Sequence, residues 1–196
     1  MKEILIATNN PHKVAEYSAM LEKIGYSVRS LADFGDIEIE ENGQTFEENA
    51  LIKARTLYEM TGIMSIADDS GIEIEALDNG PGVHSARWYH ELGDWGKNEK
   101  VLELLKDKDN RKAHFICCIA VVDKDTEEVF RGQLDGEIAM EQRGENGFGY
   151  DPIFLRPETQ KTNGEISMEE KNRISHRAKA LSQALAYLRE HYEKDC

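Results

Sequence analysis

The sequence predicts an α/β fold in a single domain that spans residues 1–196. Short apolar runs and one alternating segment have the pattern of strands, and stretches with apolar residues at helical spacing separate them. The length of 196 residues and the hydrophobic fraction of 40% are enough for one substantial core. No internal repeat or low-complexity segment interrupts the chain.

A strand and a helix are expected first. Residues 4–7 form a compact apolar run typical of a strand, and a polar turn follows it. In that turn Asn10 can cap a helix, and Pro11 suits the first helical position. The helix is predicted from apolar residues at helical spacing, which are Val14, Tyr17, Leu21 and Ile24.

A second helix and two strands are expected next. Residues 45–48 have the form of a capping box, and the buried side of the helix that they open is predicted to carry Ala50, Ala54, Leu57 and Tyr58. Residues 64–67 predict a strand, and residues 72–76, where apolar and glutamate side chains alternate, predict another. The segment Asp68-Asp69-Ser70-Gly71 is therefore expected to be a turn between two strands.

The second half of the chain is expected to hold a helix, a hairpin and a docking helix. Residues 95–106 predict the helix. Residues 114–122 and 128–134 flank a polar turn, so we expect a long antiparallel hairpin that either forms a second lobe or extends the main sheet. Spacings of four and three predict one helix packed on the core through Ile174, Ala178, Leu181, Leu185, Leu188 and Tyr192.

The composition limits the classes of partner. The 24 basic and 38 acidic residues leave a net charge of −14, which argues against a surface that coats DNA, RNA or an anionic membrane. The three cysteines do not suggest a disulfide framework, and neither a secretion signal nor a membrane-spanning run is present. We expect a soluble cytoplasmic protein, and any polyanion that it binds should be small and met by local cations.

The segment Thr8-Asn9-Asn10-Pro11-His12-Lys13 is a candidate anion site. A helix that starts after a strand presents unpaired N–H groups and the positive end of its dipole, to which Lys13 adds a full charge. Asparagine caps and first-turn lysines are also common in purely structural helices, so this segment alone is weak evidence. The P-loop pattern is absent, which disfavours a P-loop nucleotide hydrolase.

Asp68 and Asp69 are candidates for metal binding. Adjacent side chains of a strand point to opposite faces, so we expect one carboxylate to reach the site and the other to cap or pair locally. Mg²⁺ takes one or two protein carboxylates and completes its octahedron with water and substrate phosphates. One of these aspartates with a glutamate from the run 38–41 would suit that ion, although such a run is also typical of a solvated surface.

Two further features are weak when taken alone. Asn49 and Lys53 lie four positions apart and project from one face of the second helix, where an exposed lysine is the ordinary interpretation. Residues 144–152 hold three glycines and two aromatic residues, which can bring backbone close to a ligand and supply a ring for base stacking.

The C-terminal cluster of cations needs a break in its helix. On one unbroken helix Lys171, His176 and Arg177 would point in directions of roughly 0°, 140° and 240° and could not converge. Ser175 is a competent N-cap. A short helix opened by residues 167–170, followed by a new helix after Ser175, would allow all three side chains to meet one ligand.

Taken together, these stretches resemble the inosine triphosphate pyrophosphatase family. The matching segments occur in family order and span nearly the whole chain. They are Thr8-x-Asn10-x-x-Lys13, Thr45-Phe46-x-Glu48-Asn49-Ala50-x-x-Lys53-Ala54, Ala67-Asp68-Asp69-Ser70-Gly71, Pro81-Gly82-Val83-x-Ser85-Ala86-Arg87, Gly147-Phe148-Gly149-Tyr150-Asp151-Pro152 and Lys171-x-x-x-Ser175-His176-Arg177. Trp88-Tyr89-His90 departs from the family pattern, in which a tyrosine is followed by small residues.

The resemblance implies an elongated mixed β-sheet flanked by helices in two lobes, with a nucleotide cleft between them, and a homodimer. It also implies Mg²⁺-dependent hydrolysis of the noncanonical purine nucleoside triphosphates ITP, dITP and XTP to monophosphate and pyrophosphate. Asp69 is then the catalytic proton acceptor, and Glu40 and Asp69 bind the metal, with Glu40 and Glu41 hard to separate by register. The implied substrate contacts are Thr8, Asn9, Asn10, Pro11, His12, Lys13, Lys53, Ser70, Phe148, Gly149, Tyr150, Asp151, Lys171, His176 and Arg177.

On this hypothesis water attacks the α-phosphorus while the metal, Lys13 and Lys53 neutralise charge on the phosphoryl oxygens. Asp69 both anchors the metal and orients or deprotonates the water. His176 and Arg177, or backbone N–H groups near them, would read the purine 6-oxygen.

Three alternatives remain open from the sequence. A Maf-type pyrophosphatase would act on other modified nucleoside triphosphates. An aspartate-based phosphatase would release phosphate in place of pyrophosphate. A nucleotide-binding regulator would keep the site without the chemistry.

Overall fold

A computed structural model describes residues 2–8, 11–35, 37 and 39–192 of the chain. The chain divides into two compact units. The first unit comprises Met1–Asp69, Cys118–Arg131 and Ala180–Cys196, and the second comprises Ser70–Cys117 and Gly132–Lys179. The assignment of residues 1–196 to a single domain stays a prediction.

Within the described residues, eight strands form one mixed sheet in the order β2-β1-β3-β5-β6-β7-β8, with β4 paired to β3. β1 runs parallel to β2 and β3, whereas the β3–β4, β6–β7 and β7–β8 pairs are antiparallel. The predicted mixed sheet flanked by helices is confirmed. The strands are β1 (Lys2–Ile6), β2 (Tyr26–Ser30), β3 (Ser65–Ile74), β4 (Gly80–Pro81), β5 (Lys112–Val122), β6 (Glu127–Ile138), β7 (Phe154–Arg156) and β8 (Lys161–Thr162).

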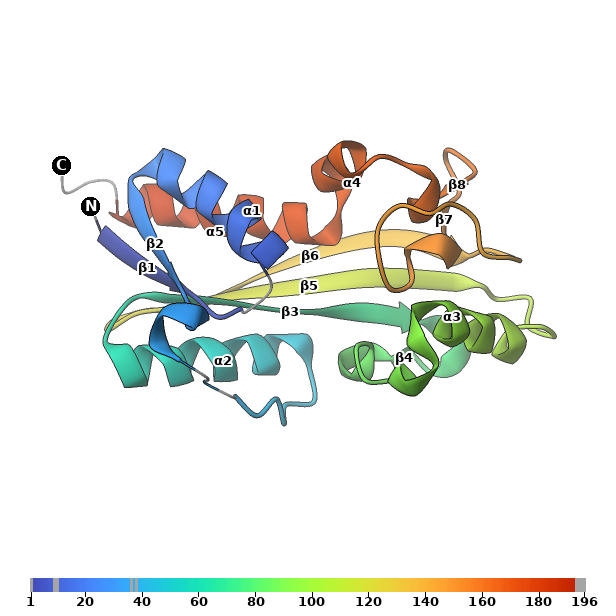
Figure 1. Ribbon diagram of the computed structural model, residues 1–196, viewed down its shortest axis with the longest axis horizontal. Coiled ribbons are helices and arrows are strands. Elements are labelled where there is room, and N and C mark those ends of the chain that lie inside the picture. The colour runs from blue at the N-terminus through green and yellow to red at the C-terminus, as the bar shows by residue number, and fades with distance from the viewer. Residues whose placement is uncertain (1, 9–10, 36, 38, 193–196) are drawn as a thin grey trace. The chain divides into compact units, whose positions relative to one another are not determined.

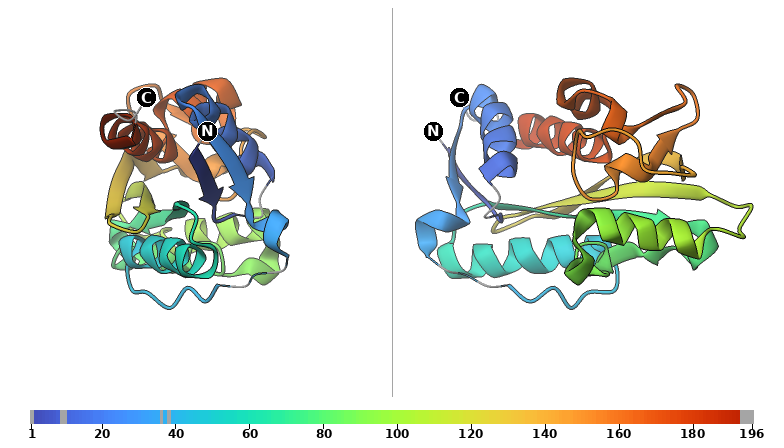
Figure 2. Two further views of the ribbon diagram at one scale, coloured as in Figure 1. Left: turned by 90° about the vertical axis from the view of Figure 1, so that its left-hand side faces the viewer. Right: turned by 45° about the vertical axis from the view of Figure 1, so that its right-hand side comes forward.

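The predicted helices are also present, but Ile24 lies beyond the end of α1, and Ile174 belongs to α4 and not to the C-terminal helix α5. In the first unit, α1 and the adjoining part of α5 lie on one face of the sheet and α2 lies on the other (Figures 1 and 2). None of the helices within the described residues is long and apolar enough to cross a membrane. The helices are α1 (Pro11–Leu21), α2 (Phe46–Thr61), α3 (Gly93–Leu104), α4 (Met168–Ile174) and α5 (His176–Tyr192).

The start of α2 confirms half of the predicted capping box. Thr45 Oγ1 accepts a hydrogen bond from the Glu48 N–H at 3.1 Å. The Glu48 carboxylate accepts from the N–H of Gln44 at 2.6 Å, one residue before the cap, so the reciprocal bond differs from the prediction. The apolar side of α2 is buried as expected through Ala50, Ala54 and Leu57, whereas Tyr58 is only partly buried.

The turn predicted at residues 68–71 is wrong, because β3 continues without interruption from Ser65 to Ile74. β1 pairs with the start of this strand, and β4 pairs with its end at Glu73 and Ile74. Gly71 is not among the glycines with positive φ. Neighbouring strands on both sides therefore outweigh the local turn preference of Asp, Ser and Gly.

The second unit has its own hydrophobic core. Ile72 and Ile74 of β3, Val101 of α3 and Phe154 of β7 are fully buried there, and Trp88 packs against them. The rings of Phe115 and Phe154 lie 4.4 Å apart. These contacts join β3, β5, β7 and α3 in one core.

The long hairpin extends the main sheet. β5 and β6 are neighbours in the sheet order and are joined by residues 123–126. The Asp123 N–H donates to the Thr126 carbonyl at 2.9 Å, which closes this turn. Of the two possibilities left by the sequence, the structure selects extension of the sheet.

The predicted break before His176 is confirmed. Ser167 caps α4 by accepting a hydrogen bond from the Glu170 N–H at 3.1 Å. Ser175 is extended (φ −63°, ψ 156°), and its Oγ accepts from the Ala178 N–H at 3.1 Å. A second helix therefore starts at His176, and α5 buries Ala180, Leu181, Ala184 and Leu188.

Candidate active site

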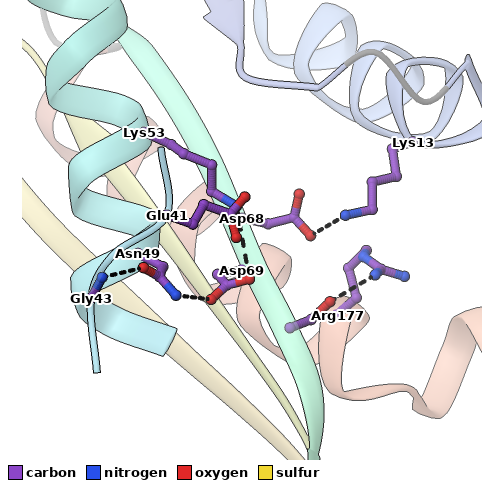
Figure 3. Close-up of polar contacts among 9 residues, drawn as sticks. Lys13, Glu41, Gly43, Asn49, Lys53, Asp68, Asp69 and Arg177 are labelled. Atoms are coloured by element: carbon purple, nitrogen blue, oxygen red, sulfur yellow. Dashed lines mark hydrogen bonds and ion pairs between the residues drawn. The ribbon is translucent and has the colours of Figure 1, made fainter. Parts of the chain in front are cut away.

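In the first unit, Lys13 and Asp68 form an ion pair. Lys13 Nζ lies 2.7 Å from Asp68 Oδ2, and the Asp68 side chain is only 2% exposed (Figure 3). Lys13 comes from the first turn of α1 and Asp68 from the middle of β3. The expectation that the second carboxylate pairs locally was wrong, because this partner lies 55 positions away in the sequence.

Asp69 has a separate set of partners. Asn49 Nδ2 donates to Asp69 Oδ2 at 3.0 Å, and Lys53 Nζ lies 3.8 Å from Asp69 Oδ1 (Figure 3). The Gly43 N–H donates to Asn49 Oδ1 at 2.8 Å, which fixes the orientation of the amide. Since adjacent strand residues point to opposite faces, Asp68 and Asp69 have different neighbours, as predicted.

The carboxyl group of Asp69 has a raised pKa. Burial is the main cause, because it disfavours the charged form. The charge of Lys53 and the hydrogen bond from Asn49 lower the pKa in part, and the nearby charges of Glu41 and Asp68 raise it. A raised pKa makes a carboxylate a better proton acceptor than an exposed aspartate.

Glu41, rather than Glu40, belongs to this group. Glu41 Oε1 lies 2.9 Å from Lys53 Nζ, whereas Glu40 is exposed. Ile37, Ile39 and Glu41 line one cavity, so alternate residues of this segment face the same side. Glu41 therefore lies beside Lys53 and Glu40 does not, while the choice of Glu40 as a metal ligand stays a prediction. The spacing of Ile37 and Ile39 was the sequence signal that could have placed Glu41 on the cavity side.

A cavity of about 240 Å³ in the first unit holds both predicted phosphate-binding cations. Its polar lining comes from Thr8, Lys13, Glu41, Lys53 and Asp68. The predicted contacts Asn9 and Asn10 lie outside the described residues, as do the side chains of Pro11 and His12. Two lysines that line one cavity suit a polyanion.

The donor set of the first unit fits a hard divalent cation. Among the described residues, no three His, Cys, Asp or Glu side chains are grouped closely enough to hold a metal by themselves. Asp69 and Glu41 both approach Lys53, and oxygen ligands are those that Mg²⁺ prefers. Two carboxylates, with substrate phosphates and water as the other ligands, match the way this ion is usually bound.

In the second unit, Lys171 and Phe148 lie around the buried carboxylate of Asp151. Lys171 Nζ and the Phe148 N–H both donate to Asp151 Oδ2, the latter at 2.8 Å. Lys171 Nζ also lies 4.4 Å from the centre of the Phe148 ring, which is 60% exposed. Tyr150 differs from Phe148, because its ring is buried and its hydroxyl donates to the Ser85 carbonyl at 2.9 Å.

Ser70, His176 and Arg177 also lie in the second unit. Arg177 Nη2 donates to Ser70 Oγ at 3.3 Å (Figure 3). The His176 ring stacks on Phe115 with centroids 4.9 Å apart and planes 12° from parallel. The imidazole is therefore packed on the core, which leaves the backbone at the start of α5 as the better candidate for reading a ligand.

Asn49 is a site residue that is absent from the substrate contacts implied by the family resemblance. Its spacing of four from Lys53 places both side chains on one face of α2, and that spacing was the available signal. The burial of the Asn49 amide and its hydrogen bond to Asp69 could not be predicted from the sequence and are seen only in the structure.

Comparison with known proteins agrees with this fold. The model of the Ham1 family matches residues 4–187. Proteins named dITP/XTP pyrophosphatase are 49% identical over 193 residues in Bacillus licheniformis (96% of this chain, 98% of that protein) and 50% identical over 186 residues in Bacillus subtilis (92% and 94%). The solved structure of a HAM1 protein from Coxiella burnetii superposes with a TM-score of 0.92 at 43% identity, covering 97% of this chain and 100% of that one. The resemblance drawn from the sequence motifs is confirmed, and the chain belongs to the Ham1 family.

Proposed function

We propose that the chain hydrolyses the noncanonical purine nucleoside triphosphates ITP, dITP and XTP to the monophosphate and pyrophosphate. The observation that carries this proposal is the buried carboxylate of Asp69, held between Asn49 and Lys53. The relatives from both Bacillus species, named dITP/XTP pyrophosphatases, support the choice of substrate.

The triphosphate is bound by residues of the first unit. Thr8, Lys13 and Lys53 line one cavity. The N–H groups in the first turn of α1 have no partners within the helix and can bind an anion. We extend this contact to Asn9, Asn10, Pro11 and His12, which complete the same segment. The lysines neutralise charge that grows on the phosphoryl oxygens as the α-phosphorus is attacked.

Asp69 is the proton acceptor. Its raised pKa makes the carboxylate a stronger base than an exposed aspartate, and Asn49 and Lys53 hold it in place. We propose Mg²⁺ as the cofactor, held by Asp69 and Glu41. When bound, the ion supplies Lewis-acid charge stabilisation and lowers the pKa of water.

The base is bound by residues of the second unit. The exposed ring of Phe148 offers a stacking surface, and Gly149 and Tyr150 continue its loop. Asp151 accepts a hydrogen bond from the backbone of Phe148, and the ammonium group of Lys171 lies over the Phe148 ring. Ser70, Arg177 and the backbone at His176 supply donors for the 6-oxygen of hypoxanthine or xanthine. Adenine has an amino group there, which would leave a buried donor unpaired at a cost of about 1–3 kcal/mol.

We also propose that the enzyme is a cytoplasmic homodimer that binds neither nucleic acid nor membranes. The net charge of −14 supports the absence of both polyanionic partners. Light scattering of the purified chain gives the oligomeric state directly.

A substrate panel tests this function. The purified chain is incubated with dITP, XTP, dATP, dGTP and UTP, with and without Mg²⁺, and pyrophosphate and phosphate are measured separately. We expect pyrophosphate from dITP and XTP only when Mg²⁺ is present. Preference for UTP would favour a Maf-type enzyme, phosphate alone would indicate a phosphatase, and binding without product would indicate a regulator.

A further inference from the structure

Two side chains of α3 hold the backbone of Gly149. Asp94 Oδ2 accepts a hydrogen bond from the Gly149 N–H at 2.8 Å. Asn98 Nδ2 donates to the Gly149 carbonyl oxygen at 2.9 Å. Asp94 and Asn98 lie four positions apart and so share one face of the helix. Both polar groups of a single loop residue are thus bound by one helix face.

Other residues of the second unit fix these two side chains. Lys97 Nζ lies 3.1 Å from Asp94 Oδ1 and 4.7 Å from the centre of the Tyr150 ring. Asn98 is 1% exposed, and its amide also donates to Gln142 Oε1 at 3.1 Å. A buried amide with two acceptors has little freedom to turn, so it sets where Gly149 can lie.

Gly149 directly follows Phe148, the proposed stacking ring. Gly149 has a φ of +61°, in the left-handed region, and Gly147 on the other side has a φ of +78°. A Cβ at Gly147 would lie 2.2 Å from Asp151 Oδ2, so that position has no room for a side chain. The loop therefore adopts one specific backbone conformation, which requires glycine on both sides of Phe148. The Phe148 ring stays exposed in this conformation.

We propose that Asp94 and Asn98 are positioning residues for base recognition. They fix Gly149 and, through it, the direction in which the Phe148 ring faces the base, without touching the nucleotide themselves. This inference rests on the proposed function. Its physical consequence is that removing either side chain loosens the stacking surface and weakens nucleotide binding, while the attack on the α-phosphorus is left almost unchanged.

A double-mutant cycle with Phe148 tests the proposal. Asp94→Ala and Asn98→Ala are made alone and together with Phe148→Ala, and kcat and KM for dITP are measured by pyrophosphate release. Each single variant should raise KM by about tenfold and change kcat by less than about threefold. In the Phe148→Ala background the same substitutions should change KM by less than about twofold, because residues that act through one another are not additive.

Two further variants separate positioning from general damage. Asp94→Asn keeps an oxygen that can accept from the Gly149 N–H, so it should recover most of the KM lost in Asp94→Ala. Glu103→Gln changes an exposed carboxylate of the same helix, paired with Lys100, and should leave both constants unchanged. Thermal unfolding is recorded for every variant. The Asp94 side chain is 58% exposed, so its substitution should leave the fold intact. The double-mutant cycle of Asp94 with Phe148 can therefore be completed even if Asn98→Ala is unstable.

The outcomes are distinct. If the increases in KM of the single variants multiply in the double variants, or if kcat falls while KM is unchanged, the positioning role is overturned. The proposed function is left standing in both cases. No pyrophosphate from the parent chain overturns the proposed function, and the positioning role with it.

Discussion

The side-chain amide of Asn49 donates a hydrogen bond to the buried carboxylate of Asp69 at 3.0 Å. Asn49 is itself fully buried, and its own oxygen accepts from the backbone of Gly43. The amide can therefore present only its N–H₂ group to Asp69. This relationship holds the proposed base in one orientation and favours its charged form.

Asp69→Asn should remove turnover without harming the fold. We expect kcat for dITP to fall on the order of 10²–10⁴-fold, because asparagine cannot accept the proton. The asparagine oxygen can still accept from Asn49, so the structure should be kept. Unchanged turnover would remove Asp69 from the mechanism.

The same variant should also reveal the cost of burying the charge. A carboxyl whose pKa is raised in the folded state favours folding at acidic pH, below its ordinary pKa, and loses that contribution as pH rises through the raised value. Without metal, Asp69→Asn should therefore match the parent at acidic pH and become the more stable of the two towards neutral pH. Denaturant unfolding at several pH values measures the difference in unfolding free energy between the variant and the parent. A difference that grows towards acidic pH would contradict the prediction.

Asn49→Ala should shift the pH profile of the enzyme. Losing the amide removes a hydrogen bond that lowers the pKa of Asp69, so the carboxylate should be protonated to a higher pH. We expect kcat/KM to fall on the order of tenfold on the acidic side and by less on the alkaline side. Glu59→Gln, which changes an exposed residue near the other end of the same helix, serves as control. An equal loss at every pH would mean that Asn49 acts only on the structure.

Glu40 and Glu41 form a matched pair for testing the metal site. Glu41→Gln should raise the Mg²⁺ concentration needed for half-maximal activity by about tenfold or more, because it removes a charged oxygen beside Lys53. Glu40→Gln changes an exposed neighbour and should leave that concentration unchanged. A reversed result would restore Glu40 as the ligand.

Arg177→Ala tests base selection. If Arg177 reads the 6-oxygen, kcat/KM for dITP should fall about tenfold or more while the weak turnover of dATP changes little. Ser70→Ala, which removes the partner of Arg177 Nη2, should give a smaller loss in the same direction. Equal losses on both substrates would mean that Arg177 binds without selecting.

Much of the fold could be predicted from local signals. The cap at Ser175 and the impossibility of converging Lys171 with Arg177 on one helix predicted the break before α5, which the structure confirms. The strand of residues 65–74 differs from the local prediction, because Asp-Ser-Gly favours a turn locally, whereas pairing with β1, β5 and β4 keeps the strand extended.

The site was harder to predict than the fold. Asp68 and Lys13 are 55 positions apart, so their ion pair has no local signature. Glu41 was separable from Glu40 only by the alternation that Ile37 and Ile39 impose. The hydrogen bonds that join Asp94 and Asn98 to Gly149 form only because α3 packs beside the loop. In the sequence, both residues look like ordinary polar residues of a helix.

The position of bond cleavage tests the central claim most directly. Hydrolysis of dITP is carried out in water labelled with a heavy oxygen isotope, and both products are analysed by mass spectrometry. Attack on the α-phosphorus, assisted by Asp69, places the label in the monophosphate and leaves the pyrophosphate unlabelled. Label in the pyrophosphate, or in free phosphate released directly from dITP, would contradict it.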